Sequence, residues 1–169
     1  MIGMIGWLVP SLFAFSIEEG SYVCVQSQQQ MEKRKKEALK VTLDSTNFMI
    51  RGMAESRLEG APYMCRTYII ESLPNVMRVT CDAYPVIDIR LDGKPTYYPT
   101  RKDGGFSSVA KVKPKRLIQQ FDASSGGFSV EYIQTQTGFD VVKSIYSPYL
   151  GEPLRVRASY VISKKENSQ

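Results

Sequence analysis

Residues 154–163, LRVRASYVIS, alternate apolar and polar side chains along almost their whole length. Alternation with a period of two is typical of a β-strand that has one face on a hydrophobic core and the other in water. Residues 85–91, PVIDIRL, repeat the pattern. We expect these two segments to point inward Ile87, Ile89, Leu91, Leu154, Val156, Ala158, Tyr160 and Ile162.

From residue 40 onward, short runs rich in β-branched and aromatic residues are separated by turn residues. This spacing predicts a mainly β protein, an antiparallel up-and-down barrel or sandwich over residues 40–169. We expect its first strands at 40–43 and 47–53. Asp92-Gly93, between two such runs, predicts a β-hairpin.

The first 17 residues, MIGMIGWLVPSLFAFSI, contain no charged side chain. They are short for a membrane span of about 20 residues and lack the basic start of a secretory signal. Three interpretations stay open: a membrane-inserted anchor, an atypical cleaved signal, and an apolar arm buried against partner subunits. We expect residues 1–20 to anchor the chain to a lipid bilayer or a partner through Trp7, Leu8, Leu12, Phe13 and Phe15.

Residues 26–39, QSQQQMEKRKKEAL, contain no Gly or Pro and are mostly good helix formers. They predict a short polar helix with Ser27 as its N-cap. We therefore expect residues 21–39 to form a linker and helix between the apolar start and the β domain.

Composition argues against catalysis, because the chain has no histidine, the commonest general base and metal ligand. Its three cysteines lack the C-x-x-C spacing of zinc or redox sites, so we expect neither a metal nor another cofactor. The net charge is +5, but Lys111, Lys113 and Lys115 recur with period two, as on the solvent face of an edge strand. Nucleic acid is not an expected partner.

Two of the cysteines are candidates for a disulfide. A hairpin centred on Leu73-Pro74 would bring Cys65 opposite Cys81, and Ile69 opposite Met77, within reach of such a bond. Two reduced core cysteines are the alternative. A disulfide would indicate an oxidising compartment outside the cytoplasm.

Three segments resemble lipocalin-like proteins of the calycin group: LDGKPTYYP at 91–99, VAKVKPKRLIQQFD at 109–122 and VVKSIYSPYLGEPLRVRASYVISKK at 141–165. The resemblance implies an up-and-down barrel around an apolar cavity that carries a small hydrophobic ligand. Fatty-acid-binding relatives hold a carboxylate with an Arg-x-Tyr pair on the final strand. Here Arg157 is followed by Ser159 at that position, and Tyr160 faces the other way.

We therefore expect a non-catalytic accessory subunit of a membrane-associated complex, such as a respiratory or photosynthetic one, with the barrel on the extracytoplasmic (periplasmic) side. Its partners would be other subunits, contacted by a loop that includes Tyr97, Tyr98, Arg101 and Phe106, and lipid, contacted by residues 1–17. A packed barrel interior is part of this interpretation. The alternative is a lipocalin-like carrier of a lipid or pigment.

Overall fold

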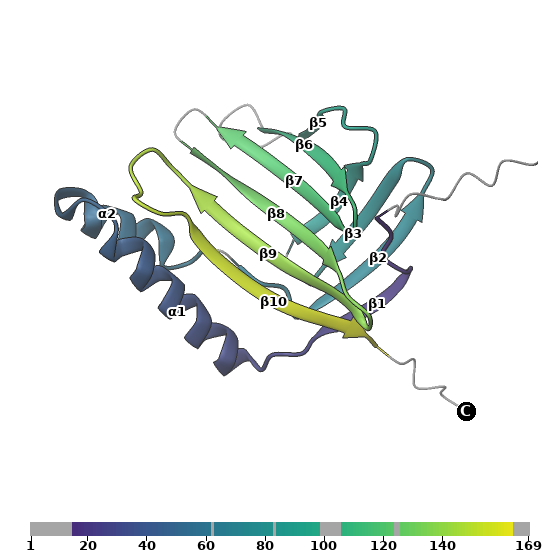
Figure 1. Cartoon of the computed structure of the whole chain (residues 1–169), viewed down its shortest axis with the longest axis horizontal. Coiled ribbons are helices and arrows are strands. Elements are labelled where there is room, and N and C mark those ends of the chain that lie inside the picture. The colour runs from purple at the N-terminus through teal and green to yellow at the C-terminus, as the bar shows by residue number, and fades with distance from the viewer. Residues whose placement is uncertain (1–14, 62, 83, 99–105, 124–125, 164–169) are drawn as a thin grey trace, which may run out of the picture.

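The computed structural model of the chain describes residues 15–61, 63–82, 84–98, 106–123 and 126–163. In this part of the chain, two helices and ten strands form, and all ten strands belong to one antiparallel sheet (Figure 1). The elements are β1 (Gly20–Cys24), α1 (Gln28–Asp44), α2 (Phe48–Leu58), β2 (Thr67–Leu73), β3 (Val76–Cys81), β4 (Tyr84–Arg90), β5 (Thr96–Tyr98), β6 (Phe106–Lys113), β7 (Arg116–Ala123), β8 (Gly126–Gln134), β9 (Gly138–Tyr146) and β10 (Leu154–Ile162).

The sheet runs in the order β4-β3-β2-β1-β10-β9-β8-β7-β6-β5 and curls into a nearly closed barrel. Its two ends, β4 and β5, are not paired, although the Tyr98 hydroxyl donates a hydrogen bond across the gap to the Asp88 carbonyl, at 3.1 Å. Gly93 makes the expected turn with a φ of +74°. The hairpin prediction is nevertheless wrong, because the strands on either side of that turn are the two ends of the sheet. The mainly β, barrel-type fold is confirmed.

The polar helix begins as expected. The Ser27 hydroxyl accepts from the Gln30 backbone N–H, and the Gln30 side chain accepts from the Ser27 N–H, which makes a capping box. The expected strands at 40–43 and 47–53 are wrong, because both segments are helical. Asn47 supplies the reason for the second, since its side chain caps α2 by accepting from the Met49 N–H at 3.0 Å.

The helices join β1 to β2, so the sheet already includes residues 20–24 and resumes only at residue 67. The expected start of the β region at residue 40 therefore matches no boundary of the sheet. α1 lies along β10 (Figure 1), where the Arg34 guanidinium donates to the Arg157 carbonyl at 3.2 Å. Gly151, in the β9–β10 loop, lies so close to the helix junction that a Cβ atom there would be 1.9 Å from the Ser45 carbonyl oxygen. The β9–β10 loop therefore packs closely against the junction of the two helices, and α2 lies beside the neighbouring ends of β8 and β9.

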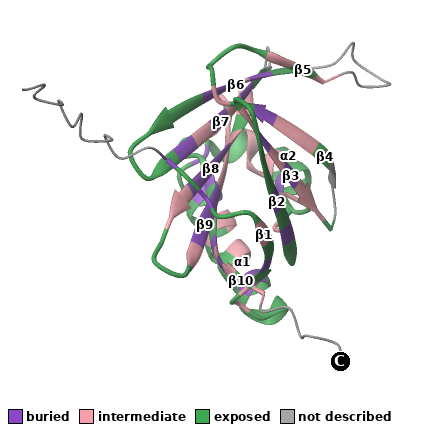
Figure 2. Cartoon of the chain, turned by 90° about the vertical axis from the view of Figure 1, so that its right-hand side faces the viewer, coloured by how far each residue is buried: buried purple, intermediate pink, exposed green. Residues whose placement is uncertain are grey.

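One end of the barrel interior is filled by aromatic rings, and we call it the aromatic end. Its members are Tyr22, Tyr68, Tyr132, Phe139 and Tyr160, all buried, with ring centroids 4.8–6.5 Å apart. Figure 2 shows further buried positions along the barrel strands. The Tyr160 hydroxyl still finds a partner, because it donates to the Cys65 carbonyl at 2.7 Å. The prediction of a packed interior is correct for this end.

Candidate functional site

The opposite end of the barrel holds a cavity of about 630 Å³ under α2, which we call the mouth cavity. This volume lies within the range of about 300–1,000 Å³ that is usual for small-molecule sites. The expectation of a packed interior therefore fails at the mouth. The lining residues are mainly apolar: Ile50, Met53, Ala54, Arg57, Leu58, Ala61, Gly126, Gly127, Ile145, Tyr146, Ser147, Tyr149 and Leu150.

Helical periodicity explains the roof of the mouth cavity. Its residues from α2 and the following turn are spaced three and four apart, which places them on one face of the helix. The floor is made by the ends of β8 and β9, where a glycine pair replaces side chains. Gly126 has a φ of +139°, and a Cβ atom on it would lie 2.4 Å from the Tyr146 carbonyl oxygen. Any larger residue would disturb this wall.

Strand register defines the rows of side chains beneath the mouth. The first row is apolar and consists of Phe121, Phe128, Ile145 and Leu154. The next row, which we call the Lys143 row, consists of Gln119, Val130, Lys143 and Val156. Below it, Leu117, Tyr132, Val141 and Ala158 lead to the aromatic end. The Lys143 row, which contains two polar side chains, thus lies between the apolar mouth and the aromatic end of the barrel.

Lys143 is the charged member of that row. Its Nζ donates to the backbone carbonyl of Tyr63, at 2.5 Å, in the segment that leads from α2 to β2. Burial lowers the pKa of Lys143 to about 8, and the negative charge of Asp82 opposes this shift. A cation is thereby held inside the barrel at a cost in desolvation.

Gln119 is the second polar side chain of the row and is only 1% exposed. Its amide nitrogen donates to the Ser108 hydroxyl at 3.0 Å and to the Tyr98 hydroxyl at 3.2 Å. Since Tyr98 in turn donates to the Asp88 carbonyl, this group links β7 through β5 to β4. Its role is to hold the unpaired seam of the barrel together.

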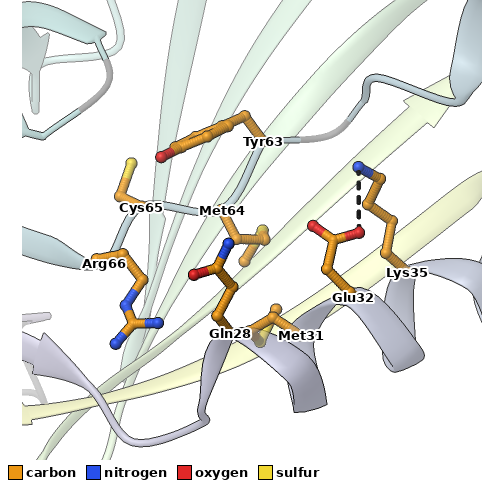
Figure 3. Close-up of a pocket in the computed structure, with 8 residues that line it drawn as sticks. All are labelled: Gln28, Met31, Glu32, Lys35, Tyr63, Met64, Cys65 and Arg66. Atoms are coloured by element: carbon orange, nitrogen blue, oxygen red, sulfur yellow. Dashed lines mark ion pairs between the residues drawn. The ribbon is translucent and has the colours of Figure 1, made fainter.

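A second, smaller pocket of about 160 Å³ lies between α1 and the segment before β2 (Figure 3). Its lining includes Met31, Met64 and an ion pair between the exposed Glu32 and the half-buried Lys35, at 4.0 Å. The volume is below that of usual small-molecule sites. We therefore regard the mouth cavity as the candidate site.

The residues expected to form an anchor divide into two groups. Phe15 is 9% exposed and, with Ile17, belongs to the barrel core. Trp7, Leu8, Leu12 and Phe13 lie outside the described residues. No helix in the described part of the chain is both long enough and apolar enough to cross a membrane.

The expected partner-contact loop is only partly within the described residues. Tyr97 is 61% exposed on β5, whereas Tyr98 is half-buried and hydrogen-bonded within the seam. Phe106 begins β6, and Arg101 lies outside the described residues. The structure thus places Tyr97 and Tyr98 on opposite faces of one short strand.

Cys65 and Cys81 are joined by a disulfide with their Cα atoms 5.9 Å apart, and Cys24 is free. The register from which we derived this pair is wrong, since Ile69 pairs with Thr80 rather than with Met77. The turn lies at Pro74-Asn75, because Asn75 adopts the left-handed conformation, with a φ of +59°. Cys65 therefore precedes β2 and reaches Cys81 from the loop.

Lys143 was not among the predicted site residues, although the sequence contains a signal for its position. In residues 139–145, FDVVKSI, Lys143 has the same parity as Phe139, Val141 and Ile145, so strict alternation places it on the inner face. The Arg-x-Tyr position lies on the last strand, whereas this cation lies one strand earlier, on β9.

No protein-family model matches the sequence, and no curated protein matches it at a significant level. Solved structures do resemble the fold. A variant of the fluorescent protein UnaG is similar over 87% of this chain and 96% of its own, with 11% identity and a TM-score of 0.52. The fatty-acid-binding protein of Drosophila melanogaster brain is similar over 86% of this chain and 99% of its own, with 14% identity and a TM-score of 0.48. Human cRBP IV is similar over 88% of this chain and 99% of its own, with 10% identity and a TM-score of 0.49.

These findings correct our first expectation about function. The similar structure with a TM-score above 0.5 is, by its title, a fluorescent protein and not a subunit of a membrane complex, so the accessory-subunit interpretation is contradicted. The alternative, a carrier of a small ligand, is the better supported of the two. The fold itself is shown: the chain has a calycin-like fold, a lipocalin-like antiparallel barrel with a helix pair between its first two strands.

Proposed function

We propose that the chain is a non-catalytic carrier that binds a small hydrophobic molecule in the mouth cavity. The single observation that carries this proposal is the apolar cavity of about 630 Å³ between α2 and the ends of β8 and β9. Transfer of apolar ligand surface from water into such a site gains roughly 25 cal/mol per Å². The lack of histidine in the sequence supports a binding role over a catalytic one.

The outer face of α2 supports the same proposal. Phe48 and Met49 are 80% and 79% exposed, beside a cavity lined in part by the same helix. A helix that leaves apolar side chains in water is weakly held by packing, so it can move at low cost. α2 would then be the element that opens to admit the ligand.

A direct test titrates the delipidated full chain with the uncharged fluorophore 1-aminoanthracene. We expect saturable binding at one site, with a dissociation constant of about 1–10 μM for a ligand of this size. The variant Ala54→Trp places an indole in the mouth cavity and should abolish binding. Ser56→Trp, on the exposed side of the same helix, is the matched control and should bind as the unmodified chain does.

Absence of saturable binding in the unmodified chain would overturn the carrier proposal. Equal binding by both tryptophan variants would place the ligand elsewhere. Melting temperatures of the two variants, measured in parallel, separate a blocked cavity from a damaged fold.

Two further expectations stand as proposals. We propose that the barrel works outside the cytoplasm, an idea supported by the Cys65–Cys81 disulfide, because such bonds persist in oxidising compartments. Thiol labelling of the denatured chain from its native host should then modify Cys24 alone. Lipid contact, predicted for residues 1–17, stays a prediction for residues 1–14 alone, because Phe15 and Ile17 belong to the barrel core. Deletion of residues 1–14 should abolish co-fractionation with membranes.

A further inference from the structure

The aromatic end of the barrel is filled on the inside and has exposed apolar side chains around its rim. Leu73 at the end of β2, Val112 near the end of β6 and Ile162 at the end of β10 are 40%, 44% and 41% exposed. Figure 1 shows the β2–β3 turn and the end of β10 on the right-hand side of the molecule. Because other strands separate these three in the sheet, the apolar surface is distributed around this end of the barrel.

The described part of the chain begins at the same end. Phe15 and Ile17 are buried in the barrel core, and the Glu19 carboxylate accepts from the Ser72 N–H at 2.9 Å, beside the β2–β3 turn. Residues 1–14, which precede Phe15 in the sequence, contain no charged side chain. Their point of attachment is therefore the aromatic end and not the mouth.

The β6–β7 turn gives this end a positive charge. Lys113 and Lys115 are exposed, and neither has an acidic partner among the residues that the structure describes. The Lys115 carbonyl accepts from the Gln134 N–H at 2.9 Å, and Gln134 pairs with Phe139 of the aromatic end. The two lysines therefore lie at the end of the barrel where the apolar chain start is attached.

The β4–β5 turn adds to this charge. Asp92 is paired with both Arg90, at 2.6 Å, and Lys94, at 4.0 Å, so two cations stand against one anion. The Leu91 N–H donates to the Asn75 carbonyl at 2.9 Å, which joins this turn to the β2–β3 turn.

Apolar side chains and positive charges on one surface match an anionic lipid bilayer. Its acyl region accepts the apolar groups, and its headgroups attract the lysines. A nucleic acid would neutralise the lysines but would leave the apolar side chains in water.

We propose that the aromatic end docks on an anionic lipid bilayer, with Lys113 and Lys115 against the headgroups and the mouth cavity facing away from the bilayer. This orientation extends to the barrel itself the lipid contact proposed for residues 1–14. A carried molecule would then enter and leave the mouth through water. The docking does not depend on what the mouth cavity binds.

The first test measures sedimentation of the full chain with vesicles of phosphatidylcholine and of an equal mixture of phosphatidylcholine and phosphatidylglycerol. Binding to the mixture should be the tighter. The double variant Lys113→Gln with Lys115→Asn should weaken it about tenfold to thirtyfold, the loss expected for two lysines near an anionic surface. Asparagine suits position 115, where φ is +57°. Lys36→Gln with Lys40→Gln, which removes two exposed lysines of α1, is the matched control and should bind as the unmodified chain does.

The second test measures orientation through quenching of tryptophan fluorescence by brominated lipids. Trp7 is the single tryptophan of the chain, so Trp7→Phe provides a background without one. In this background, Leu73→Trp should be quenched by mixed vesicles. Phe48→Trp, on α2 at the mouth, should not be quenched.

The outcomes separate docking of the barrel from its alternatives. Equal weakening by the two lysine pairs would mean that only net charge matters and would overturn the proposal. Stronger weakening by the α1 pair, or quenching of Phe48→Trp, would put the mouth on the bilayer and would also overturn it. Quenching of the native Trp7 without quenching of Leu73→Trp would keep the lipid contact of residues 1–14 and reject docking of the barrel. Binding of 1-aminoanthracene tests the carrier separately and should be the same in both lysine variants.

Discussion

The two ends of the barrel are built from the same strands and differ in what fills them. At the aromatic end, Tyr68, Phe139 and Tyr160 are buried and their rings touch across strands. At the mouth, glycines and shorter side chains leave a cavity, and α2 covers it with apolar residues left in water. The difference teaches that stability and ligand binding are separated along the barrel axis, with the Lys143 row at the boundary.

The largest expected effect tests the aromatic end. Phe139→Ala removes a fully buried ring that contacts Tyr22, Tyr68, Tyr132 and Tyr160, and should lower the free energy of unfolding by about 3–5 kcal/mol. Met53→Ala, at a mouth residue that is 59% exposed, should change it by less than about 0.5 kcal/mol. Urea unfolding followed by circular dichroism measures both. Similar losses in the two variants would contradict the division of the barrel.

The second prediction concerns the covalent link between the loop before β2 and β3. The double variant Cys65→Ser and Cys81→Ser should lose about 3 kcal/mol, because the 16-residue separation is no longer closed in the unfolded chain. Cys24→Ser is the control, and a small effect is expected, since Cys24 is half-buried and free. Equal stability of the double variant and the unmodified chain would show that the bridge does not hold the loop.

The third prediction tests the boundary row through its pH dependence. The pKa of Lys143 falls from 10.5 to about 8 in the folded chain, so between those pH values the unfolded chain binds more protons. The cost of burying the charge is therefore fully present below pH 8 and is relieved as the pH rises towards 10.5. Lys143→Met should be more stable than the unmodified chain at pH 7 by about 1–3 kcal/mol, a range that allows for the partial exposure of Lys143.

That stability difference should narrow as the pH increases from 8 to 10, and guanidinium unfolding at several pH values measures it. A constant difference would mean that another effect of the substitution dominates.

The smallest expected effect concerns the seam of the barrel, where the edge strands β4 and β5 are not paired. Tyr98→Phe removes the hydroxyl that donates to the Asp88 carbonyl and accepts from Gln119, and should cost about 0.5–1.5 kcal/mol. Tyr97→Phe, on the exposed side of the same strand, should have almost no effect. Thermal unfolding of the pair gives the difference. An equal shift for both would show that the seam is not held by this hydrogen bond.

Much of the barrel was predictable because alternation is a local signal. The inner faces of β4 and β10 follow from the period of two, and the start of α1 follows from Ser27. The helices over residues 40–53 were not predictable. β-Branched residues such as Val41 and Thr42 are compatible with either a helix or a strand, and tertiary contacts decided between the two.

The site was harder to predict because it depends on register and on contacts between distant elements. A three-residue error at the Asn75 turn assigned β2 residues to the wrong partners and the wrong face. Lys143 could be placed on an inner face by parity, but its neighbour Tyr63 is 80 residues earlier in the chain. The mouth cavity needs α2 to lie against β8 and β9, and no local pattern in the sequence encodes that approach.

The most direct measurement of the central claim is photo-crosslinking with oleic acid that carries a diazirine at its methyl end. If the apolar chain of the acid lies in the mouth cavity as proposed, adducts should map by mass spectrometry to residues 50–61 and 145–150. They should disappear when unlabelled oleic acid is added in excess. Adducts confined to residues 1–17 or to the outer faces of the strands would contradict the account.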